Sequence, residues 1–436
     1  MSTTKRAQRI EVFGREARRR IAALPAASGV VQQLRAVGAA AFAAAELPTP
    51  KTESWKYSRI GPLLEAGLLD RVAPGEARVA PSGGLDTCRL TIVDGLPGEI
   101  DPELPPGLSV SRFSAARGED RDAAERIAGR LAVAAGRPFV ALNGALLEDG
   151  LLIRVAAGLR IDRPIELVFA QSDCEAPRGV HPRVLVVLEP GASMTLIERH
   201  LGRSLALTNA VVEIAVEQGA RLDHLRLAIE AGAGRWLSAL EVEVGRDAGY
   251  DLSLIDLGAA FRRNEIGIHL AGPGAEAEVR GAGLTRDGQH LDTQMNLEHH
   301  SPQARSRQRF RLIAGETSRA VLNGRIHIER GAGKTDAALD AKGLVLARGA
   351  EIDLKPELEI YADDVQCAHG ATLGQLDARA LFYLRSRGLD EPEARSLLSF
   401  AFLAEVVAGL PNAHVREEVG AALRAAFAAP AQGEEV

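Results

Sequence analysis

The sequence predicts a mainly β protein with α-helical ends, in which a parallel β-solenoid forms the centre of the chain. Three observations predict this fold class. The period of the apolar positions changes to two from about residue 151. A turn signature, glycine followed two residues later by alternating apolar positions, then recurs along that region. After Gly374 the period returns to 3.6, which is typical of helices.

The turn signature starts at Gly191, Gly219, Gly249, Gly274 and Gly349. The first four glycines are 28, 30 and 25 residues apart, and almost no helical pattern lies between them. A unit of this size cannot bury its own apolar face, whereas stacked units can. The degenerate repeat favours a solenoid and leaves a β-sandwich open as the alternative.

We expect three regions: a helical and mixed domain over residues 1–150, a β-solenoid over 151–374 and a helical domain over 375–436. Residues 1–45 have helical spacing throughout. A second helical pattern runs over 122–135 and stops at glycine 136 with proline 138 beyond, which is a common end signal.

Three helices are predicted in the C-terminal region. The first covers residues 376–387. Asp390 is a capping residue for the second, with Glu393 at the capping-box position, and that helix runs to about residue 409. The third covers about 415–428.

Composition excludes several classes of protein. The chain has 436 residues, a net charge of −6 and 4% aromatic residues, which argues against a nucleic-acid binder. It contains no run of 18 apolar residues, so we expect no membrane span. Cys88, Cys174 and Cys367 are too few for a disulfide framework and fit a reducing, cytoplasmic location.

Cys367 and His369 are two potential metal ligands placed where the strand-like region ends. Residues i and i+2 of a strand face the same side, about 6–7 Å apart. This spacing is too wide for one small tetrahedral ion but suits two contacts along the edge of an interface. Because an iron–sulfur cluster needs about four ligands, we expect a transient site completed by a second subunit. The alternative is a buried cysteine beside a structural histidine.

Three other groups of residues could be mistaken for sites. Gly331-Ala-Gly-Lys-Thr335 resembles the end of a phosphate-binding loop but lacks the earlier glycine, so we expect a solvated turn. Asp363 and Asp364 could serve a polysaccharide-cleaving enzyme, but adjacent residues of a strand face opposite ways.

The third group is a histidine cluster. His290, His299 and His300 lie near Asp292 and Glu298. His299 and His300 are adjacent, so we expect them to face opposite sides of a strand and to have structural roles.

The segment Lys355–Gly374, KPELEIYADDVQCAHGATLG, resembles a signature of the SufB/SufD family of iron–sulfur assembly scaffolds. The pattern Cys367-Ala-His369-Gly is similar to the SufD branch, because SufB carries His-Glu-Ala-Thr there. The match continues through Leu381–Gly388 and through the Pro48–Tyr57 segment with its Glu-x-Trp-Lys-Tyr pattern.

This resemblance implies a right-handed parallel β-helix between helical terminal domains. It also implies a complex with SufB and a pair of SufC ATPases, in which SufC and not this chain hydrolyses ATP. The nascent cluster would be transient and shared with SufB. There His369 matches the histidine assigned at the SufB–SufD interface, and Cys367 matches a motif cysteine.

The same resemblance places SufC docking on the C-terminal helical domain. In this sequence the matching segment offers Phe382, Tyr383, Arg385 and Arg387. Without SufB, the open edge of the solenoid and the family resemblance both lead us to expect a homodimer. A purely structural subunit, with all ligands in SufB, remains the alternative.

Overall fold

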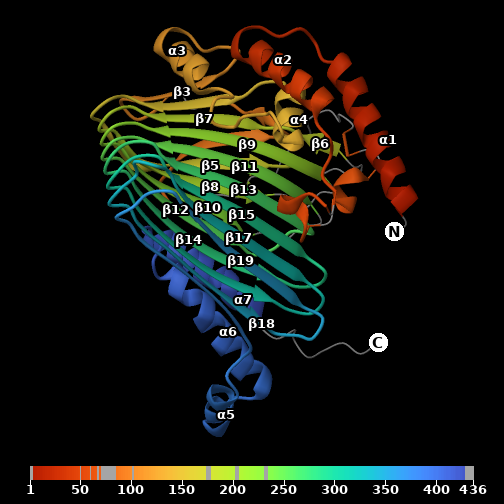
Figure 1. Ribbon diagram of the computed structural model, residues 1–436, viewed down its shortest axis with the longest axis vertical. Helices are drawn as coiled ribbons and strands as arrows, with labels where there is room; N and C mark the ends of the chain where they lie inside the picture. Colours follow the sequence, from red (N-terminus) through yellow and green to blue (C-terminus); the bar gives the residue numbers. More distant parts are fainter. Residues whose placement is uncertain are drawn as a thin grey trace.

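The computed structural model describes residues 3–49, 51–58, 60–65, 68–69, 85–100, 103–172, 178–201, 206–229 and 234–427. Two ten-stranded sheets enclose a continuous apolar core and form a parallel β-helix, with helices towards both ends of the chain (Figure 1). The predicted fold class is confirmed. The sandwich alternative is wrong, because sandwich sheets are antiparallel and nearly all neighbours here are parallel.

The chain alternates between the two sheets, and among the described strands only the pairs β1–β2 and β3–β4 are antiparallel. In spatial order, the first sheet contains β2 (Leu96–Pro97), β1 (Cys88–Val93), β5 (Arg160–Ala170), β8 (Ser193–Leu201), β10 (Arg221–Ala228), β12 (Gly249–Asp256), β14 (Glu276–Thr285), β16 (Arg305–Ala314), β18 (Asp336–Val345) and β20 (Gln366–Gly374). The second sheet contains β19 (Glu351–Ile360), β17 (Arg319–Ile328), β15 (His290–His299), β13 (Phe261–Leu270), β11 (Arg235–Val244), β9 (Ala206–Val216), β7 (Arg183–Leu188), β4 (Leu151–Val155) and β3 (Leu108–Arg112), with β6 (Arg178–Val180) paired to β9.

The glycine turns of the sequence separate successive coils. The paired residues Arg221, Gly249 and Glu276 on neighbouring strands are 28 and 27 residues apart, close to the spacing of the turn signature. Gly219 and Gly274 adopt positive φ angles of 67° and 72°, a conformation that glycine reaches without a steric penalty. Each turn therefore leads the chain into the next strand of the coil.

Inward-facing side chains form ladders from coil to coil. In the first sheet, Leu252 of β12 is paired with Val279 of β14, and both are fully buried. Each such aliphatic side chain stabilises the fold by about 1.5–3 kcal/mol relative to its exposed state. Because every coil repeats this burial against its neighbours, the solenoid core is continuous along the molecule.

The N-terminal region packs against the early coils. Its elements are α1 (Thr3–Ala22), α2 (Gly29–Ala44), η1 (Glu53–Trp55), η2 (Gly61–Leu64), α3 (Gly118–Ile127) and α4 (Pro138–Leu146).

The expectation of one helix over residues 1–45 is wrong, because a break that contains Pro25 separates α1 from α2. The predicted helix over 122–135 is also wrong, because α3 ends at Ile127. Pro138 begins α4, where its missing N–H costs nothing.

The C-terminal helices are α5 (Ala378–Ser386), α6 (Glu391–Val407) and α7 (Ala413–Phe427). The predicted capping box of α6 is confirmed, since Asp390 accepts the backbone N–H of Glu393 and the Glu393 side chain accepts that of Asp390. Apolar residues of α6 and α7 pack on the outer face of the first sheet, and an ion pair from Arg311 to Glu405 adds to this contact.

None of the described helices is long and apolar enough to cross a membrane. Cys174 and residues 428–436 lie outside the described residues.

Candidate functional site

Cys367 and His369 lie on β20, the last strand of the first sheet. Cys367 is paired with Ala337 of β18, and His369 is paired with Leu339. Ala337 and Leu339 are 2% exposed members of the apolar core. Cys367 and His369 therefore extend two inward-facing rows of side chains by one coil. The preceding members of these rows, Ala337 and Leu339, are covered by the solenoid.

The two side chains differ in exposure. Cys367 is half-buried and packs against the solenoid core, whereas His369 is exposed. Burial, together with the nearby Asp336 carboxylate, raises the pKa of the Cys367 thiol. The thiol is therefore protonated at neutral pH in the isolated chain, and the His369 imidazole is the more accessible ligand.

A cavity of about 560 Å³ has His369 in its wall. Gln308 of β16, which is paired with Leu339 in the same inward row, also lines this cavity. Gln308 is only 3% exposed, and neither its amide nitrogen nor its amide oxygen has a hydrogen-bond partner among the described protein atoms. Polar groups of this kind are costly when buried alone, so Gln308 marks a polar position beside the candidate ligands. Nothing in the sequence near Gln308 indicates this placement.

β20 supplies too few ligands for a resident cluster. Within the described part of the chain, one group of three potential ligand residues has converging atoms, and it consists of His269, Glu298 and His300 on the second sheet. Cys367 and His369 are not members of it. A cluster held by β20 would therefore need more ligands than the described residues bring together on this strand.

The predicted docking residues lie on or beside α5, which extends below the solenoid (Figure 1). α5 buries none of its side chains. Phe382 is 74% exposed and Tyr383 is 56% exposed. The Arg387 guanidinium lies 5.1 Å from the centre of the Tyr383 ring, and Arg385 forms an ion pair with Glu391. Exposed aromatic side chains with neighbouring arginines are typical of protein-binding surfaces.

The Pro48–Tyr57 segment, which contains η1, has a structural role. Trp55 is buried, its ring lies 5.4 Å from that of Phe139, and the Arg263 guanidinium lies 4.0 Å from its centre. These contacts attach the N-terminal region to the second sheet.

The glycine-rich segment and the aspartate pair both lie in turns of the β-helix. Gly331–Thr335 forms a turn between β17 and β18, as predicted, with Lys334 at a positive φ of 60°. Gly331 and Lys334 are exposed, whereas Ala332 and Thr335 are buried, so the turn is only partly solvated. Asp363 and Asp364 lie in the turn before β20, where the Asp364 carbonyl accepts the Lys334 N–H.

His299 and His300 face opposite sides, as expected. His299 is fully buried and its Nε2 lies 3.0 Å from the Ser306 hydroxyl. His300 is on the outer face, 3.4 Å from His269. The sequence interpretation missed His269, which lies 29 residues before Glu298 and beside it in the sheet. A spacing of one coil is the signal that could have found it.

Comparisons with known proteins agree with the fold. Residues 169–402 match the family model described as SUF system FeS cluster assembly, SufBD core domain. Residues 84–167 match the model of the SufBD protein N-terminal region.

Two relatives illustrate the similarity. The chain is 30% identical to the iron–sulfur cluster assembly protein SufD of Escherichia coli, over 91% of both chains. It is 28% identical to a SufBD family iron–sulfur cluster assembly protein of Synechocystis, over 85% of both chains. Together with the parallel β-helix, these matches show that the chain belongs to the SufBD family of the SUF iron–sulfur cluster assembly system.

Proposed function

We propose that this chain is a non-catalytic, cytoplasmic scaffold that pairs with SufB along its β-helix and docks the SufC ATPase through its C-terminal helices. In this proposal, His369 and Cys367 contribute to a transient iron–sulfur cluster shared with SufB. No cluster is held permanently by the chain alone.

The observation that carries the proposal is the incomplete coil at β20. Among the described strands, β20 is paired only with β18, so one edge of the strand is free to pair with another chain. The inward rows that end at Cys367 and His369 are exposed there instead of being covered by a further coil. A second β-helix placed against this end would cover both residues and add the missing ligands.

The two ligands have different parts in this proposal. An exposed imidazole can bind iron without large rearrangement. The thiol of Cys367 has a raised pKa, so a metal ion must displace its proton before sulfur can bind. We therefore assign the first contact to His369 and a secondary contact to Cys367.

The test is reconstitution of the SufB–SufC–SufD complex from this chain and its partners under anaerobic conditions, with cluster formation followed by visible absorption. His369→Ala should lower the yield of assembled cluster at least about tenfold, and Cys367→Ser should lower it less. His414→Ala, which replaces a histidine of α7, is the matched control. Unimpaired assembly by His369→Ala in a complex of normal subunit stoichiometry would contradict the ligand role and favour a purely structural subunit.

A further inference from the structure

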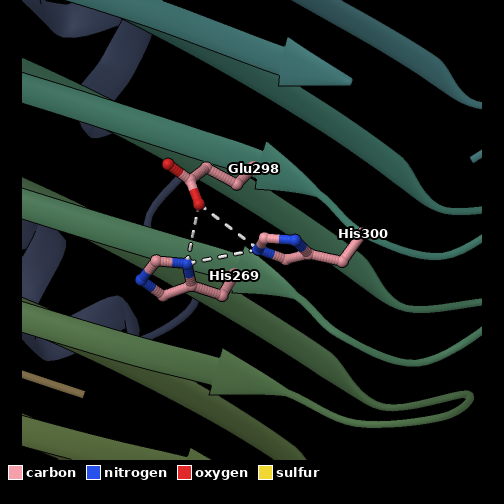
Figure 2. Close-up of side chains that lie close together, drawn as sticks. All are labelled: His269, Glu298 and His300. Carbon is pink, nitrogen blue, oxygen red and sulfur yellow. Dashed lines mark hydrogen bonds and ion pairs between the residues drawn. The ribbon is translucent and has the colours of Figure 1, made fainter. Parts of the chain in front are cut away.

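His269, Glu298 and His300 converge on one point at the outer face of the second sheet. Figure 2 shows the two imidazole rings and the carboxylate directed towards one another. His269 Nδ1 is 3.2 Å from Glu298 Oε2 and 3.4 Å from His300 Nε2. The third side of the triangle, from His300 Nε2 to Glu298 Oε2, is 3.3 Å.

This triangle has the dimensions of one face of a tetrahedral metal site. Zinc binds histidine nitrogen and carboxylate oxygen at about 2.0–2.1 Å, so its ligand atoms are about 3.3–3.4 Å apart. Two histidines and a glutamate are a ligand set known for zinc sites with an open fourth position. All three sides of the observed triangle are close to that spacing.

The β-helix itself brings these residues together. His269 of β13 is paired with Glu298 of β15, and His300 follows Glu298 by two residues, so the three side chains share one face. Regular strands on a rigid scaffold hold ligands more precisely than loops do. The side chains are 26%, 20% and 29% exposed, respectively, so an ion can reach them from solvent.

Each imidazole also has a carboxylate at its other nitrogen. His269 Nε2 is 3.2 Å from Glu241 Oε2, and His300 Nδ1 is 3.0 Å from Glu329 Oε1. Such carboxylate–histidine–metal arrangements orient the rings of metal-binding histidines.

Neighbouring residues fix the two carboxylates nearest the triangle. The second Glu298 oxygen accepts an N–H from the Asn296 amide at 2.6 Å. Gly267 lies beside Glu241 in the sheet, and a Cβ at this position would collide with Glu241 Oε2, so glycine makes room for this carboxylate.

The triad lies at the edge of a cavity of about 510 Å³. His269, Asn296 and Glu241 line this cavity, together with Trp55 of the N-terminal segment. Glu298 and His300 do not line this cavity, so only the His269 side of the triangle borders it. The feature is separate from the β20 strand, because His369 lines a different cavity.

We propose that His269, Glu298 and His300 bind a divalent first-row transition metal ion of the zinc class, in tetrahedral geometry with one open position. Glu241 and Glu329 position the two imidazoles. The proposal concerns other residues than the cluster interface and does not depend on a partner subunit.

The alternative is an ion-pair network in which protons occupy the place of the metal. Both imidazoles would then donate N–H groups to the same Glu298 oxygen. This network would hold the side chains equally close but would have no selective affinity for a metal ion.

The test uses the full chain, stripped of metal with a chelator and then titrated with Co²⁺ and with Zn²⁺. We expect one high-affinity Co²⁺ per chain, with the intense visible absorption of tetrahedral cobalt, and its displacement by one equivalent of Zn²⁺. His300→Ala should abolish this signal. Glu329→Gln, on a side chain that is 47% exposed, should weaken Zn²⁺ binding about 10–100-fold without disturbing the fold.

His414→Ala is the control and should bind as the unaltered chain does, and circular dichroism should verify that every variant is folded. Absence of stoichiometric Co²⁺ binding would overturn the proposal. Equal affinity in the folded His300→Ala and Glu329→Gln variants would overturn it as well, because the ion would then be bound elsewhere.

Discussion

Glu198 is a fully buried carboxylate on the inner wall of the solenoid, and it holds three basic side chains. It contacts His200 Nε2 at 2.5 Å, His224 Nε2 at 3.0 Å and Arg226 Nη2 at 2.8 Å. The other ring nitrogen of His200 accepts an N–H from Arg262. Burial of these groups without such partners would be very costly.

At the residue scale, His200 predicts acid sensitivity. Burial lowers the pKa of His200 to about 4 and outweighs the opposing hydrogen bond to Glu198. The unfolded chain takes up a proton near pH 6.5, so stability should fall as the pH decreases from 6.5 towards 4. His200→Gln keeps a donor and an acceptor but does not titrate. Between pH 6.5 and 5 it should lose about 2 kcal/mol less unfolding free energy than the unaltered chain.

Urea unfolding at several pH values measures this difference. His414→Gln, which replaces a histidine outside the network, is the matched control. If the unfolding free energies of His200→Gln and of the unaltered chain fell in parallel as the pH decreased, His200 would not be the cause of the acid sensitivity.

At the scale of elements, α5 predicts a docking surface. Replacing exposed Phe382 and Tyr383 by alanine removes two large side chains without opening a cavity, because α5 buries none of its residues. We expect the double variant to weaken SufC binding by at least about 30-fold, as loss of an aromatic anchor costs about 2 kcal/mol or more. Calorimetric titration with SufC measures this change.

Val37→Ala is the matched control, since Val37 is a 52% exposed apolar residue of α2. It should leave SufC affinity unaltered. If the α5 double variant bound SufC as tightly as the control, docking would have to involve another surface.

The contact between α2 and α4 gives a second prediction for an element. A Cβ at Gly38 would lie 2.7 Å from the Ala141 carbonyl oxygen of α4. Gly38→Ala should therefore lower the free energy of unfolding by about 1–3 kcal/mol, although alanine favours the helix. Gly14→Ala in α1 meets only the Arg18 side chain, at 3.6 Å, and should stabilise by up to about 1 kcal/mol. Thermal unfolding distinguishes the two, and equal shifts would contradict the close-packing explanation.

Local signals predicted the elements that local chemistry determines. The capping box at Asp390 and the glycine turns at Gly219 and Gly274 depend on a few neighbouring residues, and the structure contains them. Pro138 was misread as an end signal, because proline is also favoured in the first turn of a helix and here begins α4, whereas α3 already ends at Ile127.

Proximity across coils could not be predicted from the sequence. His269 and Glu298 meet because their strands pair with a register of one coil, and that register depends on the lengths of the turns between them. The inward position of Gln308 beside His369 has the same origin. Strand alternation placed Cys367 and His369 on one side, but only the sheet order shows that β20 is the final strand of its sheet.

At the scale of the whole molecule, the late coils predict self-association. Ile360, Tyr361 and Leu373 are 42%, 58% and 52% exposed at this end of the solenoid. Without SufB, the chain should form homodimers that bury this surface. Tyr361→Lys combined with Leu373→Lys should weaken dimerisation at least about tenfold, because it places charges in an apolar interface.

Sedimentation velocity over a range of protein concentrations measures this association. Val133→Lys changes a residue that is 50% exposed in the N-terminal region and should leave the dimer intact. A chain that stays monomeric at all concentrations, or a double variant that dimerises normally, would exclude this end as the contact surface.

The short connection between β20 and α5 has a mechanical consequence. Only residues 375–377 separate Gly374, the end of the strand, from the start of the helix. α6 and α7 are fixed to the first sheet by their apolar faces, whereas α5 has no buried side chain. A force on α5 is therefore transmitted either to the anchored α6 or along three residues to β20, a terminal strand of the first sheet. A force on α5 can therefore displace β20, the strand that carries His369, relative to the other coils of the solenoid.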